Sequence, residues 1–489
     1  MNILFLNPPF KQGRFSRASR SPAVTKGGTL YYPLWLAYGA GAAEQAGHKV
    51  KLIDCPAEGL GLGAVFDRLK DFKLDIAILE TSTPSIHSDV HMAETLKKKF
   101  PETFVVLVGT HPSALPRETL KLSRSVDAVA MGEYDVTMVT LADTLAARQP
   151  LNTVDGLAFR DGANLILNKP RTKIENLDSL LFVSAVYKKH LNYRNYFFAA
   201  ANYPLVMIIT GRGCPNRCFF CVYPQVFHGR RFRMRSVENV VAEFEYIVQN
   251  FPKVKEVGIE DDCFTADKKR VRDICEMLIA KKIKIRWYCN VRGNLDYEQL
   301  LLMKRAGCRL VTVGFESASQ EVLNNINKGE TVARYKRFMA DAHKAGVLVH
   351  GCMMAGNPGD TSETLQKSYE FAKKLNCDSM QFYPLFVYPG TEAYAWAKEK
   401  KYLTTENYKH WLTQEGLHNC VIDTPALSGR ELTRLCDNYL RRYHLRPRYL
   451  LQKILQVICH PSEGYRTFKS GLTFVGKLLA EKKGKKGPS

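Results

Sequence analysis

The sequence predicts an α/β protein in which a doubly wound parallel sheet is followed by a partial (β/α)6 barrel and a helical C-terminal region. Two observations support this fold class. Short apolar runs alternate with helical stretches over the first 150 residues and again from 205 to about 400, which is the rhythm of parallel strands joined by helices. The 489 residues also suffice for two or three cores. We therefore expect domains over 1–150 and 201–405, a connector over 151–200 and a helical region over 406–489.

The first domain is expected to contain five parallel strands. Apolar runs of strand length occur at 3–6, 49–54, 76–79, 104–108 and 128–131, and a helix over 33–47 is stopped by Gly47. Such sheets bind ligands at the carboxyl ends of their strands. Those ends carry Thr81, Ser82, Gly109, His111, Gly132 and Glu133. Small residues at these positions would let a large ligand approach the backbone.

The connector is expected to contain a hairpin. Residues 154–167 alternate apolar and polar side chains around Asp161-Gly162, a typical hairpin turn. We interpret 151–200 as a link between the two larger domains.

The second domain is expected to contain six strands, the number in a partial TIM barrel. Their apolar runs are 205–210, 256–260, 285–289, 310–315, 347–350 and 379–382. The active end of such a barrel is formed by the carboxyl ends of the strands. Polar or small residues at or beyond these ends include Glu260, Arg292, Glu316, Ser317 and Gly356.

Three cysteines follow the first of these barrel strands. Cys214, Cys218 and Cys221 have the spacing Cys-x3-Cys-x2-Cys, and Phe220 precedes the third. Three thiolates from one loop suit three irons of a 4Fe-4S cluster and leave the fourth iron open to an outside ligand. The alternative is a zinc site, for which His228 is the only nearby fourth ligand.

This cysteine motif resembles that of the radical S-adenosylmethionine (SAM) superfamily, whose members bind SAM at the open iron and cleave it to a 5′-deoxyadenosyl radical. The stretch 314–329, with Asp261-Asp262 and 388–391, is similar to the corresponding parts of the cobalamin-dependent members. The resemblance implies SAM contacts at Phe220, Glu260, Arg292, Glu316, Ser317 and Gly356. Carboxylates would bind the ribose or ammonium group of SAM, a cation its carboxylate and open backbone its adenine.

Two of these residues also have structural alternatives. Glu316 could cap a helix that begins at Ser319, and Arg292 could pair with Asp296. Neither alternative requires a ligand.

The first domain resembles the cobalamin-binding domain that precedes many radical SAM barrels. The matching pieces are Asn7-Pro8-Pro9, the helix after Pro33, 109–111 and 127–133. The resemblance implies that Thr81, Ser82, Gly109, His111, Gly132 and Glu133 contact the corrin and its nucleotide tail.

One histidine has the spacing of a cobalt ligand. Asp89-Val-His91 matches the Asp-x-His spacing of a cobalt-ligating motif, but it lies in a helical stretch after the third strand instead of after the first. We interpret His91 as a solvated helix residue and expect cobalt without a histidine ligand.

The formal net charge is +22, and residues 430–489 hold 14 Lys and Arg against 4 Asp and Glu. Nucleic acid, an anionic membrane face or an acidic cofactor or substrate could each attract this charge. The arginines within 230–235 could hold SAM, the cobalamin phosphate or an anionic substrate, or form a solvated turn. Residues 449–458 have helical apolar spacing beside Arg446 and Arg448, which suits either an anionic membrane surface or packing on the barrel.

Thirteen cysteines and the absence of a secretory signal favour reduced thiols and a cytoplasmic protein. No run of 18 apolar residues occurs, so no membrane-spanning segment is expected. Because the C-terminal region is basic, the protein could also bind peripherally to the inner face of the membrane.

We therefore expect a cobalamin-dependent radical SAM enzyme, a methyltransferase that acts on an unactivated carbon of a small-molecule or lipid substrate. Flavodoxin or ferredoxin would supply its electrons. A radical SAM cyclase or rearrangement enzyme would use the same parts without net methyl transfer.

Two further classes fit less well. A tRNA methylthiotransferase needs three N-terminal cysteines, whereas the first 200 residues contain only Cys55, so nucleic acid is not expected as a partner. A cobalamin sensor, the alternative outside enzymes, would need neither the cysteine triplet nor the barrel.

Overall fold

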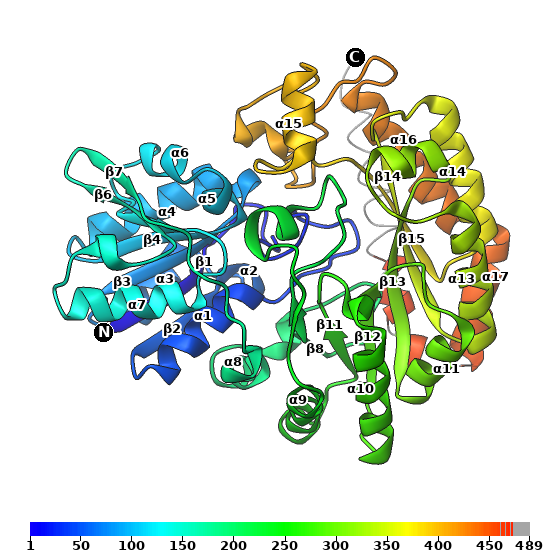
Figure 1. The fold of residues 1–489 in the computed structure, drawn as a ribbon, viewed down its shortest axis with the longest axis horizontal. Helices are drawn as coiled ribbons and strands as arrows, with labels where there is room; N and C mark the ends of the chain where they lie inside the picture. The colour runs from blue at the N-terminus through cyan, green and yellow to red at the C-terminus, as the bar shows by residue number, and fades with distance from the viewer. Residues whose placement is uncertain (460, 465, 470, 473–489) are drawn as a thin grey trace.

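The computed structural model describes residues 1–459, 461–464, 466–469 and 471–472. Two α/β lobes lie side by side, with the N-terminal sheet on the left of Figure 1 and the barrel on the right. One hydrophobic cluster runs from the first strand through both lobes to Tyr449, so the lobes form one packed body, and a second cluster lies within the N-terminal lobe. Within the described residues, no helix is long and apolar enough to cross a membrane.

The N-terminal sheet has the strand order β2-β1-β3-β4-β5-β6-β7, and its first five strands are parallel. These are β1 (Asn2–Asn7), β2 (Lys49–Asp54), β3 (Ile76–Thr81), β4 (Phe104–Gly109) and β5 (Ala128–Ala130), so all five predicted strands form. The helices are α1 (Leu34–Gln45), α2 (Cys55–Glu58), α3 (Leu62–Leu69), α4 (Ile86–Lys99), α5 (Thr110–Ala114), α6 (Pro116–Lys121) and α7 (Asp135–Ala146). Because β3 is covered on both faces, it consists of a nearly continuous apolar run.

The predicted hairpin forms at β6 (Leu157–Asp161) and β7 (Asn164–Leu167). Gly162 has a φ of 57°, a left-handed conformation that suits the tight turn. Because β6 pairs antiparallel with β5, the hairpin extends the N-terminal sheet instead of standing between two domains. The chain then crosses to the barrel through α8 (Val183–His190).

The barrel sheet is parallel and follows the chain order from β8 to β15, as a partial barrel requires. Its strands are β8 (Leu205–Ile208), β11 (Glu256–Ile259), β12 (Arg286–Val291), β13 (Cys308–Glu316), β14 (Leu348–Ala355) and β15 (Ser379–Pro384). A separate ribbon of β9 (Gly211–Arg212) and β10 (Arg233–Met234) encloses the cysteine loop. Residues 351–355, expected beyond the fifth strand, belong to β14 because they pair with β13 and β15.

Seven helices follow these strands: α9 (Val237–Asn250), α10 (Lys268–Ala280), α11 (Tyr297–Arg305), α12 (Gln320–Asn325), α13 (Val332–Ala345), α14 (Ser362–Leu375) and α15 (Glu392–Glu399). Each begins after a Ser, Thr or Asp whose side chain accepts a hydrogen bond from the first turn. Such caps satisfy backbone N–H groups that have no partner inside the helix. The sequence thus fixes where each helix starts.

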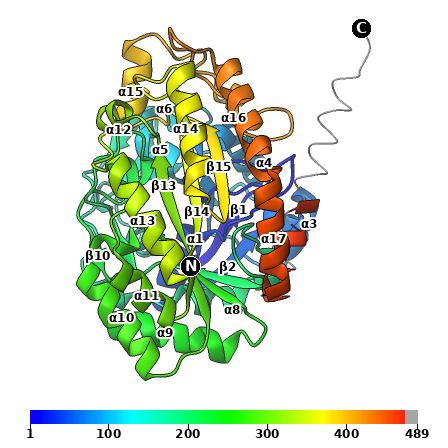
Figure 2. The same cartoon turned by 90° about the vertical axis from the view of Figure 1, so that its right-hand side faces the viewer.

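The C-terminal region is helical only from residue 429 onward. Residues 406–428, expected to be helical, are irregular apart from a single turn at Tyr408–Trp411. Helix α16 (Gly429–His444) then packs along the edge strand β15, and α17 (Pro447–Cys459) follows it on the outer surface of the barrel lobe (Figure 2).

Buried ion pairs join the two lobes. Arg212 Nη1, at the start of the cysteine loop, lies 2.7 Å from Asp135 Oδ2 and 3.4 Å from Glu133 Oε2. Arg233 also pairs with Glu133. Because these side chains are almost fully buried, removing one partner would leave a charge without compensation. The network therefore fixes the cysteine loop against the strand ends of the N-terminal sheet.

Candidate functional site

A cavity of about 930 Å³ lies between the two lobes at the carboxyl end of the barrel. Residues of 18–35 form its N-terminal wall, and the cysteine loop, the barrel strands and one face of α16 form the others. Its volume is at the upper end of the ~300–1,000 Å³ that ligand pockets usually have. The cavity is the place where both lobes can contact one ligand.

The three cysteines of the triplet all line this cavity. Gly213 allows the loop to turn, because its φ is +89° and a Cβ there would lie 2.2 Å from the Arg231 carbonyl oxygen. Asn216 Nδ2 donates to Cys214 Sγ at 3.3 Å. Burial, with Asp262 nearby, raises the pKa of the Cys221 thiol. Metal binding would reverse this by stabilising the thiolate.

The donors fit a 4Fe-4S cluster better than a single zinc ion. Among the residues that the structure describes, no three His, Cys, Asp or Glu side chains converge on one metal position. In a cubic cluster each thiolate binds a different iron, so such convergence is not required. His228, the candidate fourth zinc ligand, instead places its Nδ1 2.9 Å from Asp262 Oδ2.

Four of the six predicted SAM residues line the same cavity: Phe220, Glu260, Arg292 and Glu316. Glu260 accepts a hydrogen bond from the Tyr288 hydroxyl at 2.8 Å, and Arg292 Nε lies 2.9 Å from Glu330 Oε1. The cavity thus brings carboxylates and a guanidinium beside the cysteines, which is the set of groups that a zwitterionic ligand requires.

The other two predicted SAM residues do not line the cavity. Ser317 is buried, and its Oγ accepts from Ser319 N at 3.1 Å. Gly356 donates its N–H to Asp360 Oδ2 at 3.1 Å, and a Cβ there would lie 2.8 Å from Leu432. Both shape the ends of β13 and β14 rather than the cavity wall.

Glu316 has the most constrained geometry of the predicted residues. It has a φ of +62°, which is rare outside glycine, at a register shift between β13 and β14. Lys328 Nζ lies 2.8 Å from its Oε1, and the Tyr383 hydroxyl donates to Oε2 at 3.5 Å. Burial alone would lower the pKa of Lys328, but the facing carboxylate raises it well above its ordinary value. Strained backbone that is held by surrounding contacts is typical of functional sites.

Neither structural alternative for these residues forms. Helix α12 is capped by Ser319 itself, and Asp296 caps α11. Glu316 and Arg292 are therefore held by Lys328 and Glu330.

The six predicted cobalamin residues gather at the carboxyl edge of the N-terminal sheet, but none of them lines the cavity. Thr81 Oγ1 donates to Asp89 Oδ2 at 2.6 Å, and the Ser82 and Ser85 hydroxyls lie 2.8 Å apart. The His111 ring packs against Tyr408, with 4.9 Å between ring centroids. Burial, with a smaller effect of His87, lowers the pKa of His111 to about 3.

The remaining members of this set are also engaged with protein. Gly109 approaches the Thr81 backbone so closely that a Cβ would lie 2.2 Å from its carbonyl oxygen. Gly132 donates its N–H to Ser113 Oγ at 2.9 Å, and Glu133 pairs with two arginines. In this conformation the six residues do not form an open cradle for a corrin, and their contact with cobalamin remains a prediction.

His91 is 72% exposed on α4 and lies 3.6 Å from Glu94, as expected for a solvated helix histidine. Asp89, by contrast, is fully buried and pairs with Arg17 at 2.6 Å. The two residues therefore do not act together.

The arginines within 230–235 have structural partners. Arg230 pairs with Glu392, Arg231 with Glu175, Arg233 with Glu133 and Arg235 with Glu243. None of these four arginines lines the cavity. Arg233 and Arg235 are buried and brace the cysteine loop, whereas Arg231 is largely exposed to solvent.

Sequence reasoning missed the loop after β1. Arg20 Nη2 donates to the carbonyl oxygens of Glu260 and Asp261 at 2.9 Å each. Ser21 Oγ lies 2.8 Å from Nε2 of His418, whose ring stacks on Phe386. The only signal was the basic run of 14–20 after Pro8-Pro9, which has no helical or strand periodicity. These contacts join the N-terminal lobe to both sides of the cavity.

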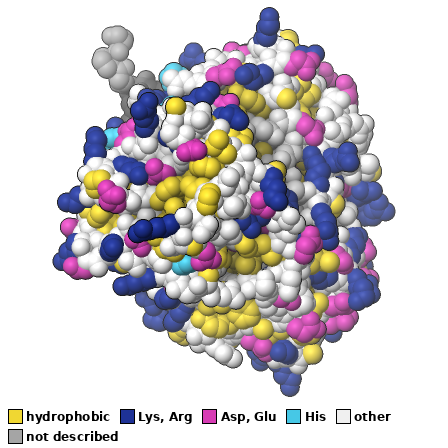
Figure 3. Space-filling model, turned by 60° about the vertical axis from the view of Figure 1, so that its left-hand side comes forward, with side chains coloured by type: hydrophobic (Ala, Val, Ile, Leu, Met, Phe, Trp, Pro, Cys, Tyr) yellow, Lys and Arg dark blue, Asp and Glu magenta, His cyan; other side chains and the backbone are white. Residues whose placement is uncertain are grey.

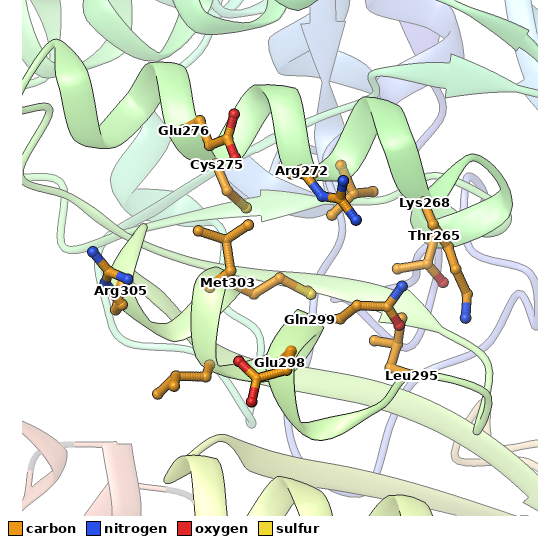
Figure 4. Close-up of a pocket in the computed structure, with 13 residues that line it drawn as sticks. Thr265, Lys268, Arg272, Cys275, Glu276, Leu295, Glu298, Gln299, Met303 and Arg305 are labelled. Atoms are coloured by element: carbon orange, nitrogen blue, oxygen red, sulfur yellow. The ribbon is translucent and has the colours of Figure 1, made fainter.

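A second, smaller cavity of about 270 Å³ lies between α10 and α11 on the outside of the barrel (Figure 4). Side chains such as Arg272, Glu276, Glu298 and Met303 line it. It contains none of the triplet cysteines and none of the predicted site residues, so the larger cavity is the candidate active site.

Both lobes match known families. A model of the radical SAM superfamily matches residues 208–372, and a model of the B12 binding domain matches residues 20–142. An uncharacterized methyltransferase of Pyrococcus horikoshii is 30% identical over 457 residues, which cover 93% of this chain and 95% of that protein. The anaerobic magnesium-protoporphyrin IX monomethyl ester cyclase of Cereibacter sphaeroides is 25% identical, over 91% of this chain and 71% of that one.

A solved structure shares the two-lobe fold. The radical SAM methyltransferase TsrM from Kitasatospora setae, with cobalamin and a [4Fe-4S] cluster bound, has a TM-score of 0.64 at 16% identity. The match covers 89% of this chain and 81% of that one. At this identity the match shows a common fold, and the predicted resemblance of both domains is confirmed.

Proposed function

The chain belongs to the radical SAM superfamily and carries a B12 binding domain ahead of its barrel, and from this we propose that it is a cobalamin-dependent methyltransferase. It would cleave SAM reductively and methylate an unactivated carbon of a small-molecule or lipid substrate. The observation that supports this most is the single cavity that holds all three triplet cysteines together with Glu260, Arg292 and Glu316.

Each group in this cavity has a role that follows from its chemistry. Cys214, Cys218 and Cys221 would hold the 4Fe-4S cluster. When bound, the cluster and SAM supply a 5′-deoxyadenosyl radical that removes hydrogen from carbon. Glu316 is oriented by Lys328 and would accept hydrogen bonds from SAM, and Arg292 would meet its carboxylate. The His418 contact with Ser21 joins two walls of the cavity and would limit access of water at that point.

The substrate would bind in the part of the cavity beyond the cysteines. Aromatic side chains are frequent there and include Tyr31, Phe198, Phe382, Phe386 and Tyr388. An apolar wall of this kind suits a largely apolar substrate, because aromatic rings bury a large contact area.

A cyclase or rearrangement enzyme is the second candidate. The similarity to the cyclase of Cereibacter sphaeroides, which extends over 91% of this chain, favours it. Both candidates would use the same cysteines and SAM contacts, and they differ in whether a methyl group reaches the product.

The proposed partners are an electron donor such as flavodoxin or ferredoxin and, through the C-terminal region, a peripheral contact with an anionic membrane. Nucleic acid is a poor candidate, because a tRNA methylthiotransferase would need three N-terminal cysteines and the first 200 residues contain only Cys55. On the face seen in Figure 3, Lys and Arg side chains are interspersed with Asp and Glu instead of forming one continuous basic patch. Nucleic-acid binding usually relies on such a patch.

The test begins with anaerobic reconstitution of the cluster. The wild-type protein should bind about four irons per chain and release 5′-deoxyadenosine from SAM under reducing conditions. Cys214→Ala should abolish both properties, whereas Cys459→Ala, which changes an exposed cysteine outside the cavity, should leave them intact. Retained SAM cleavage in Cys214→Ala would contradict the assignment.

Methyl transfer is tested separately. Extracts treated with the enzyme and SAM carrying a deuterated methyl group should yield a product that contains this label. An unlabelled but rearranged product would favour the cyclase.

A further inference from the structure

Helix α17 has two chemically different faces. On the inner face, the Tyr449 hydroxyl donates to the Asp378 carbonyl oxygen at 3.0 Å, and Lys453 Nζ lies 2.5 Å from Asp378 Oδ1. The outer face carries Leu450, Leu451, Ile454, Leu455 and Ile458, which are 46–67% exposed. We call these five residues the outer stripe. Five large apolar side chains on the solvent-facing side of one helix are unusual, because a surface helix of a globular protein normally has polar residues on that side.

The outer stripe is held in a fixed orientation. Asp378 also lies 3.4 Å from Arg466 Nη2, and Arg309 Nη1 lies 3.3 Å from Glu463 Oε2. With the Lys453 pair, these buried pairs attach α17 and the chain that follows it to the base of the barrel. Of the two alternatives predicted for 449–458, the inner face shows the packing on the barrel, and contact with an anionic membrane would involve the outer stripe.

The chain segment that carries the stripe is basic. Residues 441–462 contain no Asp or Glu, and Arg441, Arg442 and Arg448 are exposed. Among the described residues, no ion pair involves these three arginines. Apolar residues continue beyond the helix at Phe468 and Leu472, which are 69% and 57% exposed. The sequence of 473–489 then adds five Lys against one Glu.

We propose that the outer stripe docks on an anionic lipid bilayer and lies at the boundary between headgroups and acyl chains. An apolar helix face with flanking cations is the pattern of interfacial helices, because the side chains enter the acyl region and the cations meet lipid phosphates. At 13 residues, α17 is too short to span a bilayer, so it lies along the surface. This inference rests on the peripheral membrane contact proposed above, and it identifies the residues that would make that contact.

The test compares sedimentation of the full-length protein with vesicles of phosphatidylglycerol and phosphatidylcholine and with vesicles of phosphatidylcholine alone. Wild type should bind the anionic vesicles and be released by high salt, because screening weakens the arginine contacts. Ile454→Ser with Ile458→Ser should weaken binding at least about tenfold, given the transfer free energy of two large side chains. Val248→Ser, at an exposed apolar position of α9, is the matched control and should bind as wild type does.

Three results would overturn the proposal: wild type that stays in solution with anionic vesicles, equal binding by the Ile454→Ser, Ile458→Ser variant, or a wild-type dimer that this variant converts to a monomer. The last result would mean that a second copy covers the stripe. Unchanged melting temperature and iron content in both variants would show that they fold. SAM cleavage is measured in parallel, so its failure in wild type would contradict the proposed function without affecting the docking surface.

Discussion

Single buried charges determine the chemistry of the cavity. Glu316 and Lys328 face one another at 2.8 Å, and both are more than 90% buried. A pair of this kind adds little net stability, but loss of one partner leaves the other charge buried without compensation. The pair therefore fixes where a carboxylate is offered to a ligand.

Glu316→Gln is expected to weaken SAM binding about ten- to a hundredfold, since a hydrogen bond to a charged acceptor contributes about 1.5–3 kcal/mol. Equilibrium dialysis with labelled SAM measures this effect. The matched control is Glu256→Gln, which also breaks a buried ion pair, with Arg309, but at the start of β11 and outside the cavity wall. If both variants bind SAM equally well, Glu316 is structural.

Glu80 is a buried carboxyl that should make the stability of the protein depend on pH. It is buried at the end of β3, its Oε2 has no hydrogen-bond partner among the described residues, and burial raises its pKa from 4.5 to about 8. Between these values the unfolded state is the one that ionises, so stability falls as pH rises through this range. Glu80→Gln removes that loss and should stabilise the protein by about 3 kcal/mol at pH 7.

Thermal melting at several pH values measures the Glu80 effect. The difference between Glu80→Gln and wild type should vanish below about pH 3.5, where the carboxyl is protonated in both the folded and the unfolded protein. A stability difference between Glu80→Gln and wild type that is the same at neutral and at acidic pH would contradict ionisation of Glu80 as the cause.

At the scale of elements, short apolar runs in the sequence located the strands. Contacts between distant parts of the chain determined where β14 ends and where the C-terminal helices lie. The runs at 76–79 and 256–260 became β3 and β11 because a buried parallel strand needs only a short apolar segment. The end of β14 was missed because pairing with both neighbours extends it through Gly351. The C-terminal helices depend on still more distant contacts with the barrel.

Asp378 tests the attachment of these helices. It is buried between Lys453 and Arg466, and these cations hold its pKa well below the ordinary range despite burial. Asp378→Asn should destabilise the protein by about 3–5 kcal/mol at neutral pH. Because the depressed pKa contributes stability above the unfolded value, the loss should shrink as pH falls below about 4.

Chemical denaturation at two pH values measures this loss. Asp273→Asn removes an exposed pair with Lys269 and should change the free energy of unfolding by less than about 0.5 kcal/mol. Equal effects of the two substitutions would show that the C-terminal helices are only loosely attached.

At the scale of the whole molecule, the candidate site belongs to neither lobe alone. The cysteine spacing and Glu316 could be found in the sequence because each lies within a short motif. The contacts of Arg20 and His418 could not, because 18–26 and 413–418 lack periodicity and meet only after both lobes have folded. For the same reason, the sequence did not reveal that Tyr408 packs on His111, one of the predicted cobalamin residues.

Cobalamin binding gives a prediction at this scale. His91 is exposed on α4, and His111 is buried against Tyr408, so neither is placed to ligate cobalt in the cavity. Paramagnetic resonance of bound cob(II)alamin should therefore lack splitting from the imidazole nitrogens of His91 and His111. Splitting that disappears in His91→Ala or His111→Ala would show that a histidine does reach the cobalt.

The ion pairs at the base of the barrel can form only in a certain order while the chain is being synthesised. Asp378 belongs to the barrel, but its partners Lys453 and Arg466 are synthesised only after the last barrel strand. A nascent barrel therefore holds this buried charge without its partners until the chain up to Arg466 has been made, whereas Arg309 can already pair with Glu256. Chains released early would lack these partners and expose the base of the barrel, which makes them targets for chaperones and proteases.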